Sequence, residues 1–177
     1  MNQDLLDLYD RASAWTNSKV EGATEKLDAT TPCDEWDVRT LLNHMLETQR
    51  YFLGSAQGQD VSPPSTSPPE LLSEQPADDF ARARREMLDV YGEPGVIEKT
   101  GPSLGIAFSD LLLHGWDLAK ATGQDTTLDP ELVDACWTVI NPQMELLRGS
   151  GMFGNQLDVP DTADDQTKLL AVLGRRA

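Results

Sequence analysis

The feature that most constrains this chain is the segment Ser103–Ala121, which is apolar nearly all round yet carries two acids and a histidine. At 3.6 residues per turn it makes a helix of about five turns. On that helix Asp110, His114 and Asp117 share one stripe, because they stand at i, i+4 and i+7. An apolar helix of this kind belongs inside a bundle. Its charged groups are costly there unless each is paired or bound to a metal.

Asp110 and His114 have the spacing at which one helix face offers two ligands to a single cation. A lone helical histidine is more often a hydrogen-bonded core or boundary residue, so a second source of ligands is needed to favour a metal. The chain has one other histidine, His44. If its helix packs beside Ser103–Ala121, then His44, Asp110 and His114 converge on one divalent cation and leave positions open for water or substrate. Asp117 is the candidate catalytic residue, as a base, as a holder of metal-bound water, or by orienting His114.

The rest of the chain is also predicted to be helical, because no convincing strand periodicity of five or more residues occurs in it. We expect one domain over residues 1–177. Asp34 or Asp37 caps the second helix, whose core face holds Val38, Leu41, Leu42, Met45 and Phe52. A proline-rich, flexible connection is expected over residues 54–75, and a loop over 92–102. The expected helices span residues 3–25, from about 38 onward, 77–91, 103–121, 129–148 with a kink at Pro142, and 164–173.

The charge balance excludes two classes of partner. Thirty acidic against 14 basic residues give a net charge of −16, which repels nucleic acids and anionic membranes. No apolar run is long enough to span a bilayer, and the N-terminus carries acids where a signal peptide has basic residues, so we expect a cytoplasmic protein. Cys33 and Cys136 are then expected to be thiols packed as small hydrophobes.

Two local features keep alternatives open. Arg82, Arg84 and Arg85 are the only basic cluster, and they form either a solvated face or a seat for an anionic ligand. Cys33 precedes the helix that bears His44, so cysteine–histidine chemistry is formally open. Neither a Gly-rich phosphate loop nor a nucleophile elbow occurs.

Three sequence blocks resemble those of actinobacterial DinB-like proteins related to the N-terminal domain of mycothiol-dependent maleylpyruvate isomerase. The blocks are TPCDEWDVRTLLNHM, LLLHGWDLAKATGQ and VPDTADDQTKLLAVLGR. The resemblance covers nearly the whole chain outside the proline-rich connection. It implies an all-α, DinB-like four-helix bundle, here with extra short helices and the long connection. It also implies a divalent metal, commonly zinc or nickel, whose ligands map onto His44, Asp110 and His114.

Two departures from the isomerase limit what the resemblance implies. Asp110 stands where the isomerase has Glu and other members have His, and Asp is one methylene shorter. The isomerase also has a C-terminal domain for which this chain has no room, so maleylpyruvate isomerisation is not carried over.

What the resemblance still implies is a thiol S-transferase, or an isomerase of another kind. A metal would activate the sulfur of mycothiol, and the other partner would be a small electrophile. The alternatives are a non-catalytic metal- or ligand-binding stress or regulatory protein and an inert bundle. A homodimer is possible, but no exposed apolar stripe is clear enough to argue for one.

Overall fold

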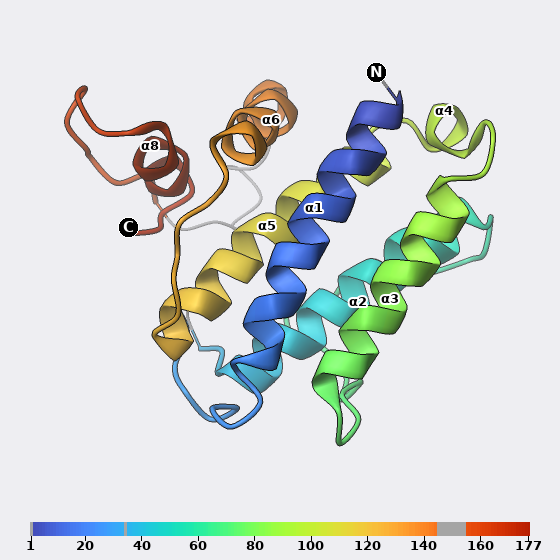
Figure 1. Cartoon of the computed structure of the whole chain (residues 1–177), viewed down its shortest axis with the longest axis horizontal. Coiled ribbons are helices and arrows are strands. Elements are labelled where there is room, and N and C mark those ends of the chain that lie inside the picture. Colours follow the sequence, from blue (N-terminus) through green and yellow to red (C-terminus); the bar gives the residue numbers. More distant parts are fainter. Residues whose placement is uncertain (1, 34, 145–154) are drawn as a thin grey trace. The chain divides into compact units, whose positions relative to one another are not determined.

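The computed structural model describes residues 2–33, 35–144 and 155–177, and these residues form helices without any strand. The prediction of an all-α chain is therefore confirmed. The elements, labelled in Figure 1, are α1 (Asn2–Glu21), α2 (Val38–Ala56), α3 (Pro76–Tyr91), α4 (Val96–Thr100), α5 (Ser103–Thr122), α6 (Pro130–Ile140), the 3₁₀ turn η1 (Asn141–Gln143) and α8 (Asp165–Val172).

The helices gather into two compact units, Met1–Thr126 and Thr127–Ala177. In the second unit α6 packs against α8, and the backbone N–H of Leu128 donates to Gln166 Oε1 at 2.8 Å. Asp164 caps α8 by accepting from the N–H of Thr167 at 2.8 Å, as its position before the helix predicts. That the whole chain is one domain stays a prediction.

The first unit is a four-helix bundle. Its long helices contact one another in the cyclic order α1, α5, α2, α3 (Figure 1), so each helix buries two faces against neighbours. All five core residues predicted for α2 are buried. α5 has 14 buried residues among its 20, which confirms that this helix, apolar nearly all round, is largely buried.

Several boundaries differ from those predicted. α1 ends at Glu21 because Gly22 weakens the helix and short turns follow it, the first from Ala23 N to Val20 O. The expected loop at 92–102 contains α4, which is too short to show periodicity. α6 gives way after Ile140 to a 3₁₀ turn that contains Pro142, whose ring cannot continue an α-helix. The last part of the predicted helix, 145–148, lies outside the described residues.

The proline-rich connection follows α2 and is hydrogen-bonded to its surface. Asn43, which is buried, accepts at Oδ1 from the N–H groups of Leu71 and Leu72 at 2.6 and 3.0 Å. Glu47 Oε2 accepts from the N–H of Ser65 at 3.0 Å. These contacts satisfy backbone groups that have no partner in a regular element. The flexibility of the connection stays a prediction.

Asp37, one of the two caps proposed for α2, gives a prediction about stability. Its Oδ1 accepts from the N–H and hydroxyl of Thr40 at 2.8 and 2.7 Å. Burial acts most strongly on the pKa of Asp37 and raises it, but the Thr40 bonds and the Arg39 charge together hold it below its ordinary value. We expect Asp37→Ala to lower the free energy of unfolding by about 1 kcal/mol, measured by urea denaturation at neutral pH.

Asp37→Asn is the matched control, because it keeps an oxygen that can cap the helix. Since the folded-state pKa of Asp37 is depressed, the ionised cap contributes stability above the unfolded-state pKa and loses it as pH falls through the folded value. The difference between wild type and Asp37→Ala should therefore shrink in acid. An equal difference at all pH values would show that the capping carboxylate is not its source. Asp34, the other proposed cap, lies outside the described residues.

Candidate metal centre

The packing of α5 on α1 fixes the direction in which the stripe of polar residues on α5 faces. Thr16, which is fully buried, donates its hydroxyl to the carbonyl of Leu111 at 3.2 Å. Gly115 lies at the same contact, where its missing side chain leaves room for Thr16. At its other end α5 stops at Gly123, whose φ of 71° is the left-handed conformation expected of a terminating glycine.

The structure brings together the three residues predicted as metal ligands. Asp110 Oδ1 lies 3.5 Å from His114 Nε2 and 3.9 Å from His44 Nε2. The three donor atoms fall within 4.8 Å of one another. Their side chains are partly buried, with Asp110 the most exposed at 26%. Two imidazoles and one carboxylate are a donor set suited to zinc or nickel, so the residues present fit a divalent metal; their role as ligands stays a prediction.

Asp117, the predicted catalytic residue, is completely buried behind His114. Its Oδ2 lies 3.0 Å from His114 Nδ1. A carboxylate can only accept, so this contact is a hydrogen bond when neutral His114 carries its proton on Nδ1, which leaves the lone pair on Nε2, toward Asp110. This is the arrangement in which a carboxylate orients a metal-binding histidine. The geometry favours the orienting role among those considered for Asp117, while a role as base stays a prediction.

His44 lies on α2, and 14% of its side chain is exposed. Its Nε2 faces Asp110 Oδ1 at 3.9 Å, and its Nδ1 is buried. Burial has the largest effect on the pKa of His44 and lowers it, but the Asp110 carboxylate, with a smaller contribution from Glu47, more than offsets this and raises the pKa overall. The His44 imidazole therefore stands in the negative field of Asp110, which favours a cation held at its Nε2.

Two further residues complete the centre and were not identified as part of it from sequence. The ring of Trp36 lies over the imidazoles, with its centroid 4.7 Å from that of His44 and 6.3 Å from that of His114. Its Nε1 donates to the carbonyl of Thr66 in the proline-rich connection at 3.2 Å. Trp36 therefore covers the apolar side of the cluster.

Cys33 is the other residue. Its half-buried Sγ donates to Asp117 Oδ2 at 3.3 Å and lies 3.8 Å from His114 Nδ1. The TPCDEW block that precedes α2 was a signal for both residues, but the cysteine chemistry considered from sequence paired Cys33 with His44. The structure places its sulfur beside His114 and Asp117 instead.

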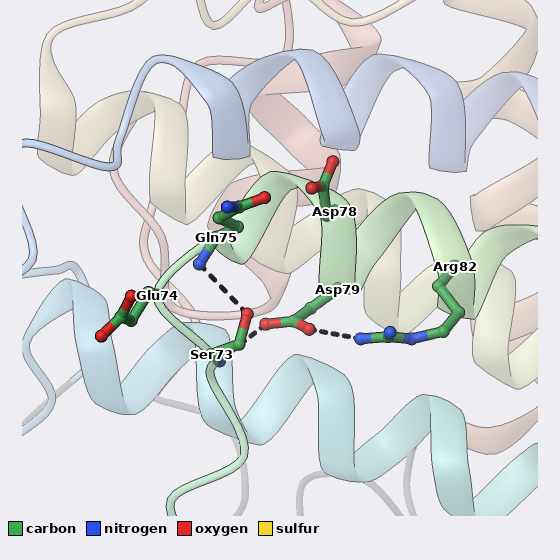
Figure 2. Close-up of a pocket in the computed structure, with 6 residues that line it drawn as sticks. All are labelled: Ser73, Glu74, Gln75, Asp78, Asp79 and Arg82. Atoms are coloured by element: carbon green, nitrogen blue, oxygen red, sulfur yellow. Dashed lines mark hydrogen bonds and ion pairs between the residues drawn. The ribbon is translucent and has the colours of Figure 1, made fainter.

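Two of the three clustered arginines on α3, Arg82 and Arg84, are paired with acidic residues and so are not free to bind an anion. Arg84 pairs with Asp10 and donates from Nε to Ser13 Oγ on α1. Arg82 pairs with Asp79 beside a surface hollow, where the other oxygen of Asp79 accepts from the N–H of Ser73 at 2.7 Å (Figure 2). Acidic side chains of the same chain therefore pair with the guanidinium groups of both arginines. Arg85 is exposed.

Comparisons with known proteins agree with this picture. The sequence model described as the mycothiol maleylpyruvate isomerase N-terminal domain matches residues 9–119, a stretch that contains every residue of the centre. Two uncharacterized proteins of Mycobacterium tuberculosis, from strains CDC 1551 / Oshkosh and ATCC 25618 / H37Rv, are each 29% identical to the chain over 166 residues. The match covers 85% of this chain and 86% of each relative. No solved structure matches.

Among the described residues, no helix is long and apolar enough to cross a membrane.

Proposed function

We propose that this chain, which belongs to the mycothiol maleylpyruvate isomerase N-terminal domain family, is a divalent-metal-dependent enzyme that joins a small thiol, through its sulfur, to an electrophile. The observation that carries the proposal is the convergence of the chain's two histidines with Asp110, all donors within 4.8 Å. Mycothiol is the thiol proposed, because the family's description names it.

In this proposal His44, Asp110 and His114 hold the metal, with zinc or nickel preferred for a mixed nitrogen and oxygen donor set. A divalent cation lowers the pKa of a thiol coordinated to it, which makes a thiolate available at neutral pH. Asp110 is the most exposed of the three side chains, so a small thiol is expected to approach from its side.

The neighbouring residues have supporting roles. Asp117 keeps the proton of His114 on Nδ1 and so keeps the Nε2 lone pair directed at the centre. Trp36 lies beside the two imidazoles, and its indole takes up space that water would otherwise fill, which strengthens electrostatic interactions inside the site.

The test is S-conjugation by the purified full chain. We expect metal-loaded protein to accelerate conjugation of mycothiol to at least one member of a panel of aryl halides, epoxides and unsaturated acids. Chelator-treated protein should be inactive and should regain activity on addition of metal. Glutathione in place of mycothiol controls for unspecific thiol activation. Metal-loaded protein without activity toward any electrophile would contradict the transferase proposal.

A second candidate function is a non-catalytic binding protein. The observation that favours it is the engagement of Asp117, a buried carboxylate that already accepts from His114 and Cys33 and so is poorly placed to take a proton from substrate. Tight, metal-dependent binding of mycothiol without turnover, measured by calorimetry, would support this alternative over the enzyme.

A further inference from the structure

Behind the proposed metal ligands, a second group of donor atoms closes into a triangle. Cys33 Sγ, His114 Nδ1 and Asp117 Oδ2 are separated by 3.8, 3.0 and 3.3 Å, taken in order round the triangle. A tetrahedral ion with bonds of about 2.0–2.3 Å to sulfur, nitrogen and oxygen has ligand-to-ligand edges of roughly 3.3–3.6 Å. The three separations lie within a few tenths of an ångström of those edges, so only small side-chain adjustments separate the triangle from coordination geometry.

We propose that Cys33, His114 and Asp117 form a second cation site, selective for thiophilic divalent ions such as Cd²⁺ and Zn²⁺. The first site, formed by His44, Asp110 and His114, contains no sulfur. The triangle contains a thiol, and soft ions prefer thiolate ligands. Binding replaces the proton of the Cys33 thiol with the ion and releases that proton to solvent. Thiolate and carboxylate together then neutralise the two positive charges of the ion, which lowers the cost of holding it beside a fully buried Asp117.

The two sites share one imidazole and therefore alternate. Neutral His114 has a single lone pair. When the proton is on Nδ1 and is donated to Asp117, the lone pair on Nε2 is available to the first site. When the proton is on Nε2, which faces Asp110 Oδ1 at 3.5 Å, the lone pair on Nδ1 is available to the second site. Each tautomer thus has a carboxylate acceptor ready for its proton, and a thiophilic ion at Cys33 withdraws His114 from the first site.

The second site is reachable from the surface. Cys33 is half-buried and lies in the loop before α2. Thr31 holds this loop closed by donating its N–H to the carbonyl of Trp36 at 3.2 Å, and the N–H of Cys33 donates to Thr31 Oγ1 at 3.1 Å. A bonded loop of this kind presents the sulfur at a fixed position, as a preorganised ligand requires.

The test is a Cd²⁺ titration of the full chain, monitored by ultraviolet sulfur-to-metal charge-transfer absorption and by calorimetry. We expect one equivalent bound with the absorption band. Cys33→Ser should lose the band and lower Cd²⁺ affinity at least about tenfold, the lower end of what loss of a group supporting a metal costs. Cys136→Ser is the matched control and should keep the band, because it removes the only other thiol. A band that survives in Cys33→Ser would overturn the proposal.

A competition experiment separates this site from the proposed enzyme function. Protein loaded with Mn²⁺, which has little affinity for sulfur, should release it when one equivalent of Cd²⁺ is added to wild type, whereas Cys33→Ser should need a higher Cd²⁺ concentration for the same release. His44→Ala should still bind Cd²⁺ with the band, whatever the outcome of the conjugation assay. Loss of the band in His44→Ala, or simultaneous binding of Mn²⁺ and Cd²⁺ in wild type, would contradict two alternating sites.

Discussion

His114→Ala is expected to lower the affinity of the protein for divalent metal by more than about 100-fold, because the side chain removed is a proposed direct ligand rather than an outer partner, whose loss costs about 10–100-fold. Its Nε2 faces Asp110 at 3.5 Å, and its Nδ1 faces Asp117 at 3.0 Å. The measurement is metal content after dialysis, followed by calorimetric titration with Zn²⁺.

A second consequence of this substitution must be separated from metal loss. Without His114, the completely buried Asp117 loses a hydrogen-bond donor, which costs about 1–3 kcal/mol of stability. Asp110→Asn therefore serves as a second variant, because it removes a charged ligand from a partly exposed position and leaves Asp117 and its partners in place. We expect weaker metal binding with unchanged helical content.

Glu47→Gln is the matched control for general loss of negative charge. Glu47 neighbours His44 but is not among the proposed ligands, and glutamine keeps an oxygen that can accept from the N–H of Ser65. This variant should bind metal as wild type does. A folded His114→Ala protein that still holds one equivalent of metal at wild-type affinity would contradict the assigned centre.

The proposed ligands were accessible from sequence because most of their geometry is local. Asp110 and His114 lie on one helix face whatever the tertiary packing. Only His44 needed a tertiary assumption, and the chain offered no other histidine to pair with His114. Helix starts were predictable for a similar reason, since Asp37, Asp129 and Asp164 each announce a first turn through a capping side chain.

The Cys33 contact was not accessible in this way. Cys33 and Asp117 are 84 residues apart, and their meeting requires that α2 and α5 run antiparallel, so that the segment before α2 meets the last turns of α5. Periodicity identifies the buried face of a helix but not its direction relative to a neighbour. The partner of Arg84 was hidden for the same reason, because charge alone did not reveal that packing would bring Asp10 to it. The Arg82–Asp79 pair, by contrast, is an i, i+3 pair on one helix.

Gly115→Val is expected to lower the free energy of unfolding by about 3 kcal/mol, at the upper end of the usual cost of overpacking. A Cβ at this position meets Thr16 Oγ1 at 2.5 Å and Trp15 Cζ3 at 2.9 Å. Thr16 cannot retreat without loss, because it is buried and its hydroxyl donates to the carbonyl of Leu111. Urea denaturation monitored by helical circular dichroism measures the effect.

Gly115→Ala tests the same contact with a smaller side chain, and the sign of its effect on the free energy of unfolding is informative. Alanine favours a helix interior over glycine by about 1 kcal/mol, so a net loss of stability means that the clash outweighs the gain in helix propensity. Thr16→Ala removes the atom nearest the new Cβ and should relieve the clash, whereas Thr16→Ser keeps a hydroxyl there and should not. A double-mutant cycle between positions 16 and 115 is expected to show a coupling of about 0.5–3 kcal/mol. If Gly115→Ala instead stabilised the otherwise wild-type protein, α1 and α5 would have to lie farther apart than described. The contact between Thr16 and Gly115 would then no longer support the rotation of α5 that directs His114 toward α2.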